Sequence, residues 1–158
     1  MADRGAGTLV LGVGSLLRGD DAIGVLAAQR LQAQPDLPPG VIVLDGGTAG
    51  LGLIPRWAGF RRLILIDAVN MNLSPGAIRR IPWIEARVTG HDRALSAHQT
   101  DLADALLLAE TLEMLPPEVV IFGVQPASMD WDQPLSRAVR SALPDLIDAL
   151  LAELRIAP

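Results

Sequence analysis

The sequence contains no cysteine, no lysine and no tyrosine among its 158 residues. Without cysteine, disulfide bonds, a catalytic thiol and a thiolate metal site are all excluded. Without lysine, the chain offers neither a Schiff-base amine nor the phosphate-binding lysine of a Walker-type loop. Apart from two histidines, every basic residue is an arginine.

Aromatic residues and positive charge are also scarce. The chain has three tryptophans and two phenylalanines, and its formal net charge is −5. A stacking platform for single-stranded nucleic acid needs more aromatic side chains, and a phosphate-backbone binder needs the opposite charge. We therefore expect no nucleic-acid partner.

Long apolar runs are missing as well. No run reaches the roughly 18 residues that a membrane span requires, and the opening "MADRGAG" lacks the apolar stretch of a signal peptide. We expect a cytoplasmic protein with no membrane partner. The length fits one domain over residues 1–158.

Short apolar segments alternate with stretches of helical periodicity along the chain. The apolar segments predict buried strands at 8–14, 41–47, 61–69 and 118–124, with an edge strand at 77–86 because of Pro82. The helical pattern predicts helices at 21–33, 48–59, 100–115 and 134–154, with a loop at 87–99. This alternation is typical of an α/β protein. We predict a three-layer α/β/α domain with a twisted, mostly parallel five-stranded sheet and one antiparallel edge strand.

Acidic residues follow three of the predicted strands. Asp20 and Asp21 come after the first strand and its glycines, Asp45 ends the second, and Asp67 ends the third. Ligands of open α/β sheets bind beyond the carboxyl ends of the strands. The sequence therefore predicts a carboxylate-lined site at this edge of the sheet.

His98 stands just before the helix predicted to begin near Thr100. A helix N-terminus disfavours imidazolium, so this ring is expected to be neutral and able to bind a metal. Two carboxylates and one imidazole can hold a divalent first-row ion with open coordination positions. Asp21, Asp67 and His98 are the predicted set. Asp20 is expected to cap the helix that follows it, and His91 to lie on the surface.

A dinucleotide site is one alternative for the same segment. Gly12 and Gly14 match the first two glycines of G-x-G-x-x-G, but Leu17 stands at the third position. Asp45 would suit a ribose hydroxyl. Two adjacent carboxylates beside the phosphate seat would repel a phosphate, and this outweighs the partial match.

Two further alternatives remain open. Asp21 and Asp67 can form a dyad that shares one proton, as in aspartic proteases. The domain can also recognise a partner without catalysis. A serine nucleophile is disfavoured because no G-x-S-x-G elbow is present.

Five blocks of sequence together resemble a known family. They are "LGVGSLLRGDDAIGV" (11–25), "LDGGTAG" (44–50), "LILIDAV" (63–69), "SAHQTDLADAL" (96–106) and "FGVQPASMDW" (122–131). In this order they resemble the [NiFe]-hydrogenase maturation proteases, and the similarity runs from about residue 9 to residue 154. Ser15 departs from the asparagine usual there, although serine can still hydrogen-bond the turn.

The resemblance implies an aspartyl-type endopeptidase that removes the C-terminal extension of a hydrogenase large-subunit precursor after nickel insertion. It implies that Asp21, Asp67 and His98 contact nickel that the substrate supplies. Our own hypothesis is that Asp21 and Asp67 are the catalytic residues and that a carboxylate there assists the water. The acids would then occupy the phosphate position because this cleft faces a cation. Since each molecule must dock a much larger precursor, we expect a monomer.

The resemblance leaves several points open. It does not identify the client hydrogenase or the cleaved bond, nor whether nickel or a carboxylate activates the water. A metal-sensing chaperone that binds the precursor without cleaving it is the alternative function. Asp45, Gly46 and Gly47 either line the peptide groove or form a tight turn. Trp131 is a possible contact with the large partner.

Overall fold

The computed structural model describes residues 7–89 and 100–156. The strands are β1 (Thr8–Val13), β2 (Val41–Gly47), β3 (Arg62–Ala68), β4 (Ile78–Pro82) and β5 (Glu118–Val124). The α-helices are α1 (Ile23–Gln32), α2 (Ile54–Trp57), α3 (Trp83–Thr89), α4 (Thr100–Thr111) and α5 (Arg137–Leu154). Two 3₁₀-helices, η1 (Gly19–Ala22) and η2 (Gly50–Leu53), directly precede α1 and α2.

The five strands form one sheet in the order β2-β1-β3-β5-β4. All neighbours are parallel except β4, which runs antiparallel to β5 at the edge. β1 and β3 are buried along their whole length, which explains their continuous apolar sequences. The predicted five-stranded sheet with one antiparallel edge strand is confirmed.

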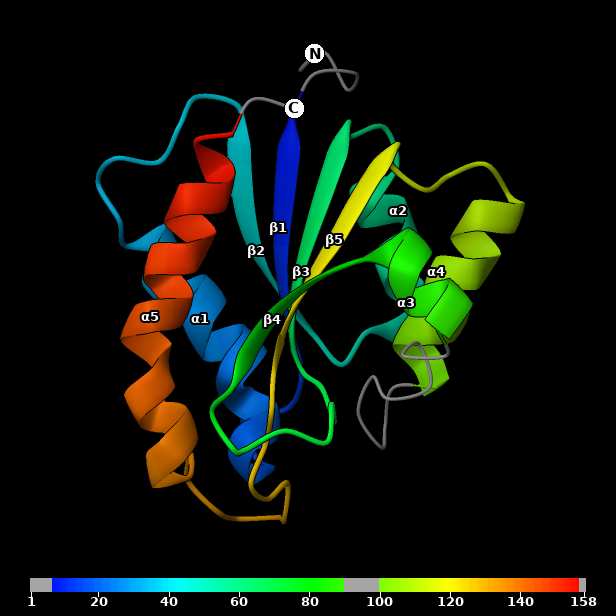
Figure 1. The fold of residues 1–158 in the computed structure, drawn as a ribbon. Helices are drawn as coiled ribbons and strands as arrows, with labels where there is room; N and C mark the ends of the chain where they lie inside the picture. The colour runs from blue at the N-terminus through cyan, green and yellow to red at the C-terminus, as the bar shows by residue number, and fades with distance from the viewer. Residues whose placement is uncertain (1–6, 90–99, 157–158) are drawn as a thin grey trace.

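Helices cover both faces of the sheet (Figure 1): α1 and α5 lie on one face, and α2, α3 and α4 on the other. Side chains of β1 alternate between the two layers, as the strand period requires. Leu9 and Leu11 belong to the core beneath α2 to α4, while Val10 belongs to the core beneath α1 and α5. The predicted three-layer arrangement is therefore confirmed.

The segment after β4 differs from the prediction. The expected strand at 77–86 ends at Pro82, and the following residues form helix α3 instead of strand and loop. Trp83 and Ala86 are buried in the core, three residues apart as on one helix face. Proline at the end of an edge strand cannot donate a further ladder hydrogen bond, which favours a change of structure there.

The last helix also starts later than predicted. It was expected to open at Pro134, but it begins at Arg137. Ser136 is the N-cap residue, and its Oγ accepts a hydrogen bond from Val139 N at 3.3 Å. The capping serine, and not the proline, sets the start of α5.

Close packing of α1 on β1 depends on two glycines. A Cβ atom on Gly12 would lie 2.0 Å from the carbonyl oxygen of Gly24, and one on Gly24 would lie 2.2 Å from that of Ile66. Neither position therefore accepts a side chain. This contact fixes α1, and with it η1, at the carboxyl end of β1.

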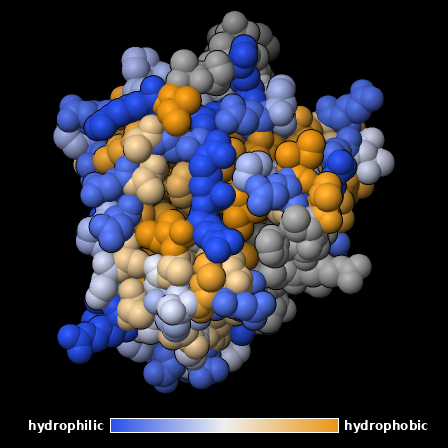
Figure 2. Space-filling model, viewed as in Figure 1, coloured by the Kyte–Doolittle hydropathy of each residue, from blue (hydrophilic) through white to orange (hydrophobic). Residues whose placement is uncertain are grey.

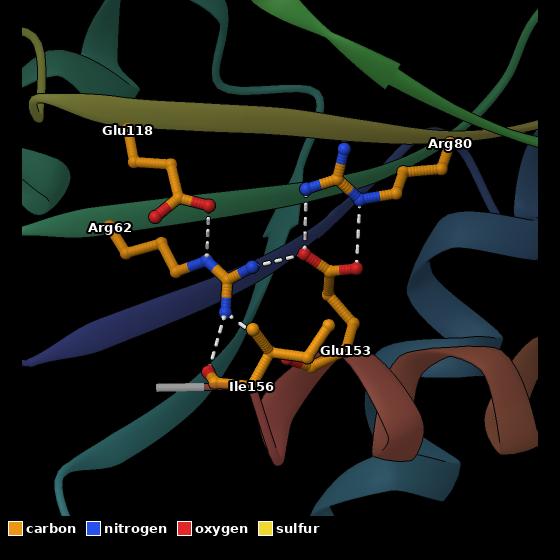
Figure 3. A network of polar contacts seen from close by, with 5 residues as sticks. All are labelled: Arg62, Arg80, Glu118, Glu153 and Ile156. Atoms are coloured by element: carbon orange, nitrogen blue, oxygen red, sulfur yellow. Dashed lines mark hydrogen bonds and ion pairs between the residues drawn. The ribbon is translucent and has the colours of Figure 1, made fainter. Parts of the chain in front are cut away.

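A partly buried ion network ties the end of α5 to the amino end of the sheet (Figure 3). Arg62, only 2% exposed, pairs with Glu118 and with Glu153. Arg80 donates two hydrogen bonds to Glu153, of 2.8 and 2.9 Å. These hydrogen bonds from Arg80 are the main reason why the pKa of Glu153 lies below its usual value. The same contact raises the pKa of Arg80.

The face of the molecule shown in Figure 2 carries both hydrophilic and hydrophobic residues, and hydrophobic residues gather over α3 and α4. Exposed apolar side chains of this part include Ile84, Val88 and Leu108. Within residues 7–89 and 100–156, no helix is both long and apolar enough to cross a bilayer.

Candidate functional site

The turn after β1 places Asp21 at the carboxyl end of the strand. Gly14 has φ +129°, and a Cβ there would lie 1.9 Å from the Asp21 carbonyl oxygen, so only glycine fits. Ser15 N donates to Asp21 Oδ2 at 2.9 Å, and Ser15 Oγ accepts from Leu17 N at 3.2 Å. Serine thus hydrogen-bonds the turn, as expected at this position. The Asp21 side chain is 3% exposed.

Asp67 lies near the carboxyl end of β3, the strand next to β1. It is fully buried and pairs with Gly123 of β5. The residue before it, Ile66, lies opposite Gly12 of β1, and η1 contacts β3. Asp21, in η1 after β1, and Asp67, near the end of β3, therefore both lie at the carboxyl end of the sheet, where the sequence predicts a carboxylate-lined site. Their chemical roles stay a prediction.

The predicted third ligand, His98, lies outside the described residues, as does His91. Among the residues that the structure does describe, no group of three or more histidine or acidic side chains is placed to hold a metal ion. The set of Asp21, Asp67 and His98 is therefore still a prediction from the sequence. Two of its members stand at one edge of the sheet.

Asp20 does not cap a helix, although the sequence predicts that it does. Neither η1 nor α1 has a side-chain cap at its N-terminus. The buried Asp20 carboxylate instead accepts backbone N–H groups from Ala127 at 2.8 Å, Ser128 at 3.2 Å and Ser136 at 2.7 Å. It thereby holds the loop that joins β5 to α5. A local cap prediction fails here because all three donors lie more than 100 positions further along the chain.

Asp45 forms a local turn at the end of β2. Its exposed side chain accepts a hydrogen bond from Gly47 N at 2.8 Å, and Gly47 has φ +50°. This is the tight-turn alternative for the "DGG" segment. Gly47 O in turn accepts a hydrogen bond from Gly14 N at 2.9 Å, so the turns after β1 and β2 support each other.

Two loops far apart in sequence lie side by side at this edge. Asp132 N donates to Leu17 O at 2.9 Å, and Gly19 N donates to Gln133 O at 3.1 Å. The Arg18 guanidinium stands 5.2 Å from the ring centre of Trp131. The sequence singled out Trp131 but gave no signal for Arg18, because nothing local relates two residues 113 positions apart.

The fold and the buried acids define a class of protein. It is a three-layer α/β/α domain with carboxylates at the carboxyl end of a mostly parallel sheet and no thiol or amine nucleophile. Such a site suits binding of a cation or assistance to a water molecule, and this is the chemistry of a carboxylate-dependent hydrolase.

Comparison with known proteins identifies the family. The family model described as "Hydrogenase maturation protease" matches residues 25–153. Hydrogenase 2 maturation protease of Escherichia coli is 36% identical over 150 residues, which cover 93% of this chain and 90% of that protein. Hydrogenase expression/formation protein HupD of Bradyrhizobium diazoefficiens is 36% identical over 142 residues, 89% of this chain and 73% of the relative.

Solved structures agree with this result. The hydrogenase maturating endopeptidase HybD from E. coli superposes with a TM-score of 0.83 at 33% identity, covering 94% of this chain and 92% of that one. The [NiFe] hydrogenase maturation protease HybD from Thermococcus kodakarensis gives 0.74 at 26% identity, with coverage of 94% and 99%. The chain belongs to the hydrogenase maturation protease family, whose members act as endopeptidases in hydrogenase maturation.

Proposed function

We propose that this protein removes the C-terminal extension of a [NiFe]-hydrogenase large-subunit precursor after nickel has been inserted into that precursor. Nickel bound by the substrate is the recognition signal, and Asp21, Asp67 and His98 contact it. The observation that carries the proposal is the pair of buried acids at the carboxyl end of the sheet, Asp21 in η1 and Asp67 in the neighbouring strand β3.

The chemistry of these side chains supports recognition of a cation held by another protein. Carboxylates are hard ligands, and the chain has no cysteine to compete for nickel bound by thiolates of the precursor. The protease therefore binds the ion for recognition and leaves it in the precursor. A backbone N–H group of Ser15 holds one oxygen of Asp21 and so fixes the orientation of this carboxylate at the carboxyl end of the sheet.

Cleavage consumes one water molecule. A carboxylate of the pair accepts a proton as the water oxygen adds to the carbonyl carbon, and the proton then passes to the leaving nitrogen as the C–N bond breaks. The products are a new carboxyl terminus and a free peptide with an amino terminus. Asp21 and Asp67 are the proposed catalytic residues. We also propose that the protein acts as a monomer in the cytoplasm.

Intact-mass spectrometry tests the proposal directly. A large-subunit precursor is incubated with the protein, once nickel-loaded and once nickel-free. We expect loss of a C-terminal peptide in the loaded sample alone. Cleavage in both samples would contradict nickel recognition, while binding without cleavage in either would favour the chaperone alternative. Size-exclusion chromatography with light scattering measures the molar mass in solution and so tests whether the protein is a monomer.

A further inference from the structure

Three large apolar side chains are exposed where the two loops meet beside Asp21. Leu16 is 53% exposed, Leu17 63% and Trp131 60%. The other two tryptophans of the chain, Trp57 and Trp83, are buried. Exposed side chains of this size gathered at one place are typical of an interaction surface. We call Leu16, Leu17, Arg18 and Trp131 the loop patch.

The loop patch is held in a fixed position relative to the site. Asp20 anchors the loop that carries Trp131 through three backbone N–H groups, and Asp132 N bonds to Leu17 O. Asp20 is the immediate neighbour of Asp21 in η1. A partner that sits on the patch is therefore placed beside Asp21 without any reordering of these loops.

Arg18 gives the second, independent observation. Its Nε and Nη1 atoms are buried and have no hydrogen-bond acceptor among the described residues. The guanidinium instead stands over the ring of Trp131. A guanidinium offers five N–H donors, and leaving buried donors unsatisfied is costly. The patch therefore lacks an oxygen acceptor, which a bound partner can supply.

We propose that the loop patch binds the peptide segment of the precursor next to the cleaved bond. The segment packs an apolar side chain against Leu17 and Trp131 and offers a carbonyl or carboxylate oxygen to Arg18. This inference rests on the proposed function, because it names a surface that positions the same substrate. Arg18 and Trp131 are substrate-positioning residues and take no part in the chemical step.

An extended peptide fits the loop patch better than other occupants. A lipid surface is disfavoured because the protein carries a net charge of −5. The exposed apolar area comes from three side chains on two loops, which is small for a stable dimer. A peptide supplies both an apolar side chain and oxygen acceptors within a few residues.

Binding must move the Trp131 ring or the guanidinium, because the Arg18 donors are covered at present. Trp131 is the exposed tryptophan of the three, so acrylamide quenching of fluorescence reports on it. We expect the precursor to protect Trp131 from acrylamide. A parallel titration of Trp131→Phe subtracts the signal of all other tryptophans, including those of the precursor.

Steady-state cleavage separates positioning from catalysis. We expect Arg18→Gln to raise KM about tenfold and to leave kcat nearly unchanged, since it removes binding that is equal in ground and transition states. Trp131→Ala should raise KM by about tenfold or more, and Leu17→Ser by less. Arg61→Gln and Leu112→Ser are the matched controls, because both residues are exposed and lie away from the loop patch. Arg61 directly precedes β3 at the amino end of the sheet, and Leu112 directly follows the last residue of α4.

The dependence of KM on salt concentration identifies the kind of oxygen that Arg18 binds. If it belongs to a carboxylate, KM of the wild type rises with ionic strength, and Arg18→Gln removes most of this dependence. If it is a backbone carbonyl, KM depends little on salt, but Arg18→Gln still raises it. Both results support the peptide subsite. An unchanged KM in Arg18→Gln and in Trp131→Ala overturns it.

The proposed function and the loop patch can fail separately. Wild-type cleavage with unaltered KM in the patch variants would leave the protease function standing and refute the patch. Absence of cleavage, with Trp131 protected by the precursor and binding weakened in Arg18→Gln, would refute the protease function and support the patch. Absence of both cleavage and protection would refute both.

Discussion

The two ends of the sheet both bury acidic side chains, but they hold them in different ways. At the amino end, Glu153 accepts hydrogen bonds from the guanidinium groups of Arg62 and Arg80. At the carboxyl end, Asp20 and Asp21 accept hydrogen bonds from backbone N–H groups. The first arrangement pairs the acid with guanidinium groups of opposite charge, whereas the second fixes the orientation of the acid through the main chain.

This difference separates a structural ion network from a site for a cation. Glu153 is satisfied by side chains of the same protein and gains nothing from an external charge. A carboxylate fixed by main-chain dipoles still attracts a metal ion or a proton. Buried acids alone therefore do not identify a site: Asp20 has backbone partners like Asp21 but anchors a loop, and the proposed site consists of Asp21 and Asp67 with His98.

Asp67→Asn is expected to have the largest effect of the substitutions at the carboxyl end. We expect cleavage of nickel-loaded precursor to fall by about 10³-fold or more, since the proposed base and nickel contact is lost. The variant should still fold and show a cooperative thermal melt, because asparagine has nearly the same shape. Mass spectrometry of the product and a thermal melt measure the two quantities.

The matched control for this prediction is Asp148→Asn. It makes the same chemical change on an exposed acid of α5 and should retain full activity. Full activity in Asp67→Asn would show that this acid is not catalytic. The two ends of the sheet would then no longer differ in function.

Glu153→Gln tests the amino end. We expect it to lower the free energy of unfolding by about 3 kcal/mol, because it leaves the buried Arg62 with Glu118 as its remaining ion partner. Urea denaturation measures the change. Since this network lies at the end of the sheet away from the site, kcat of the folded variant should equal that of the wild type. A large drop in kcat would show that the two ends are coupled.

Asp20→Asn should have a smaller effect, of about 2 kcal/mol in the free energy of unfolding. The two carboxylate oxygens accept three N–H groups, and an amide presents one NH₂ group that repels at least one of these donors. Urea denaturation gives the loss, and acrylamide quenching of Trp131 reports on the released loop. Unchanged stability together with unchanged quenching would refute the anchoring role.

The smallest expected effect is the pH dependence that comes from Glu153. Its pKa in the folded protein lies below the ordinary value of 4.5, chiefly because Arg80 donates to it. Its contribution to stability is thus complete above pH 4.5 and is lost as the pH falls through the lowered pKa. Urea titrations at a series of acidic pH values should show a shallower loss for Glu153→Gln than for the wild type. Equal slopes would contradict this assignment.

Patterns along the sequence predict the fold well where structure depends on local periodicity. The continuous apolar segments give β1, β3 and β5 nearly to the residue, and the acids that follow β1 and end β3 lie at the carboxyl end of the sheet, as expected. The chain after Pro82 was predicted as strand and then loop, because seven residues are too few to show helical periodicity clearly.

Contacts between distant segments escaped prediction. Asp20 looks like a helix cap from its neighbours, yet its donors belong to the loop after β5. Arg18 has no local feature that relates it to Trp131. The Glu153 network joins three separate strands to the end of α5, and no spacing rule connects them. These contacts arise from tertiary packing and become visible only in three dimensions.

The anchoring of the β5–α5 loop by main-chain groups has a consequence for protein engineering. Asp20 contacts backbone N–H groups, so the hold is independent of the side chains at positions 127, 128 and 136, provided that none is proline. Loop sequences from other members of the family can therefore be grafted between β5 and α5 while Asp21 keeps its place. Such chimeras would show whether the loop that carries Trp131 influences the choice of substrate, as the proposed loop patch predicts, while Asp20 and Asp21 are left unchanged.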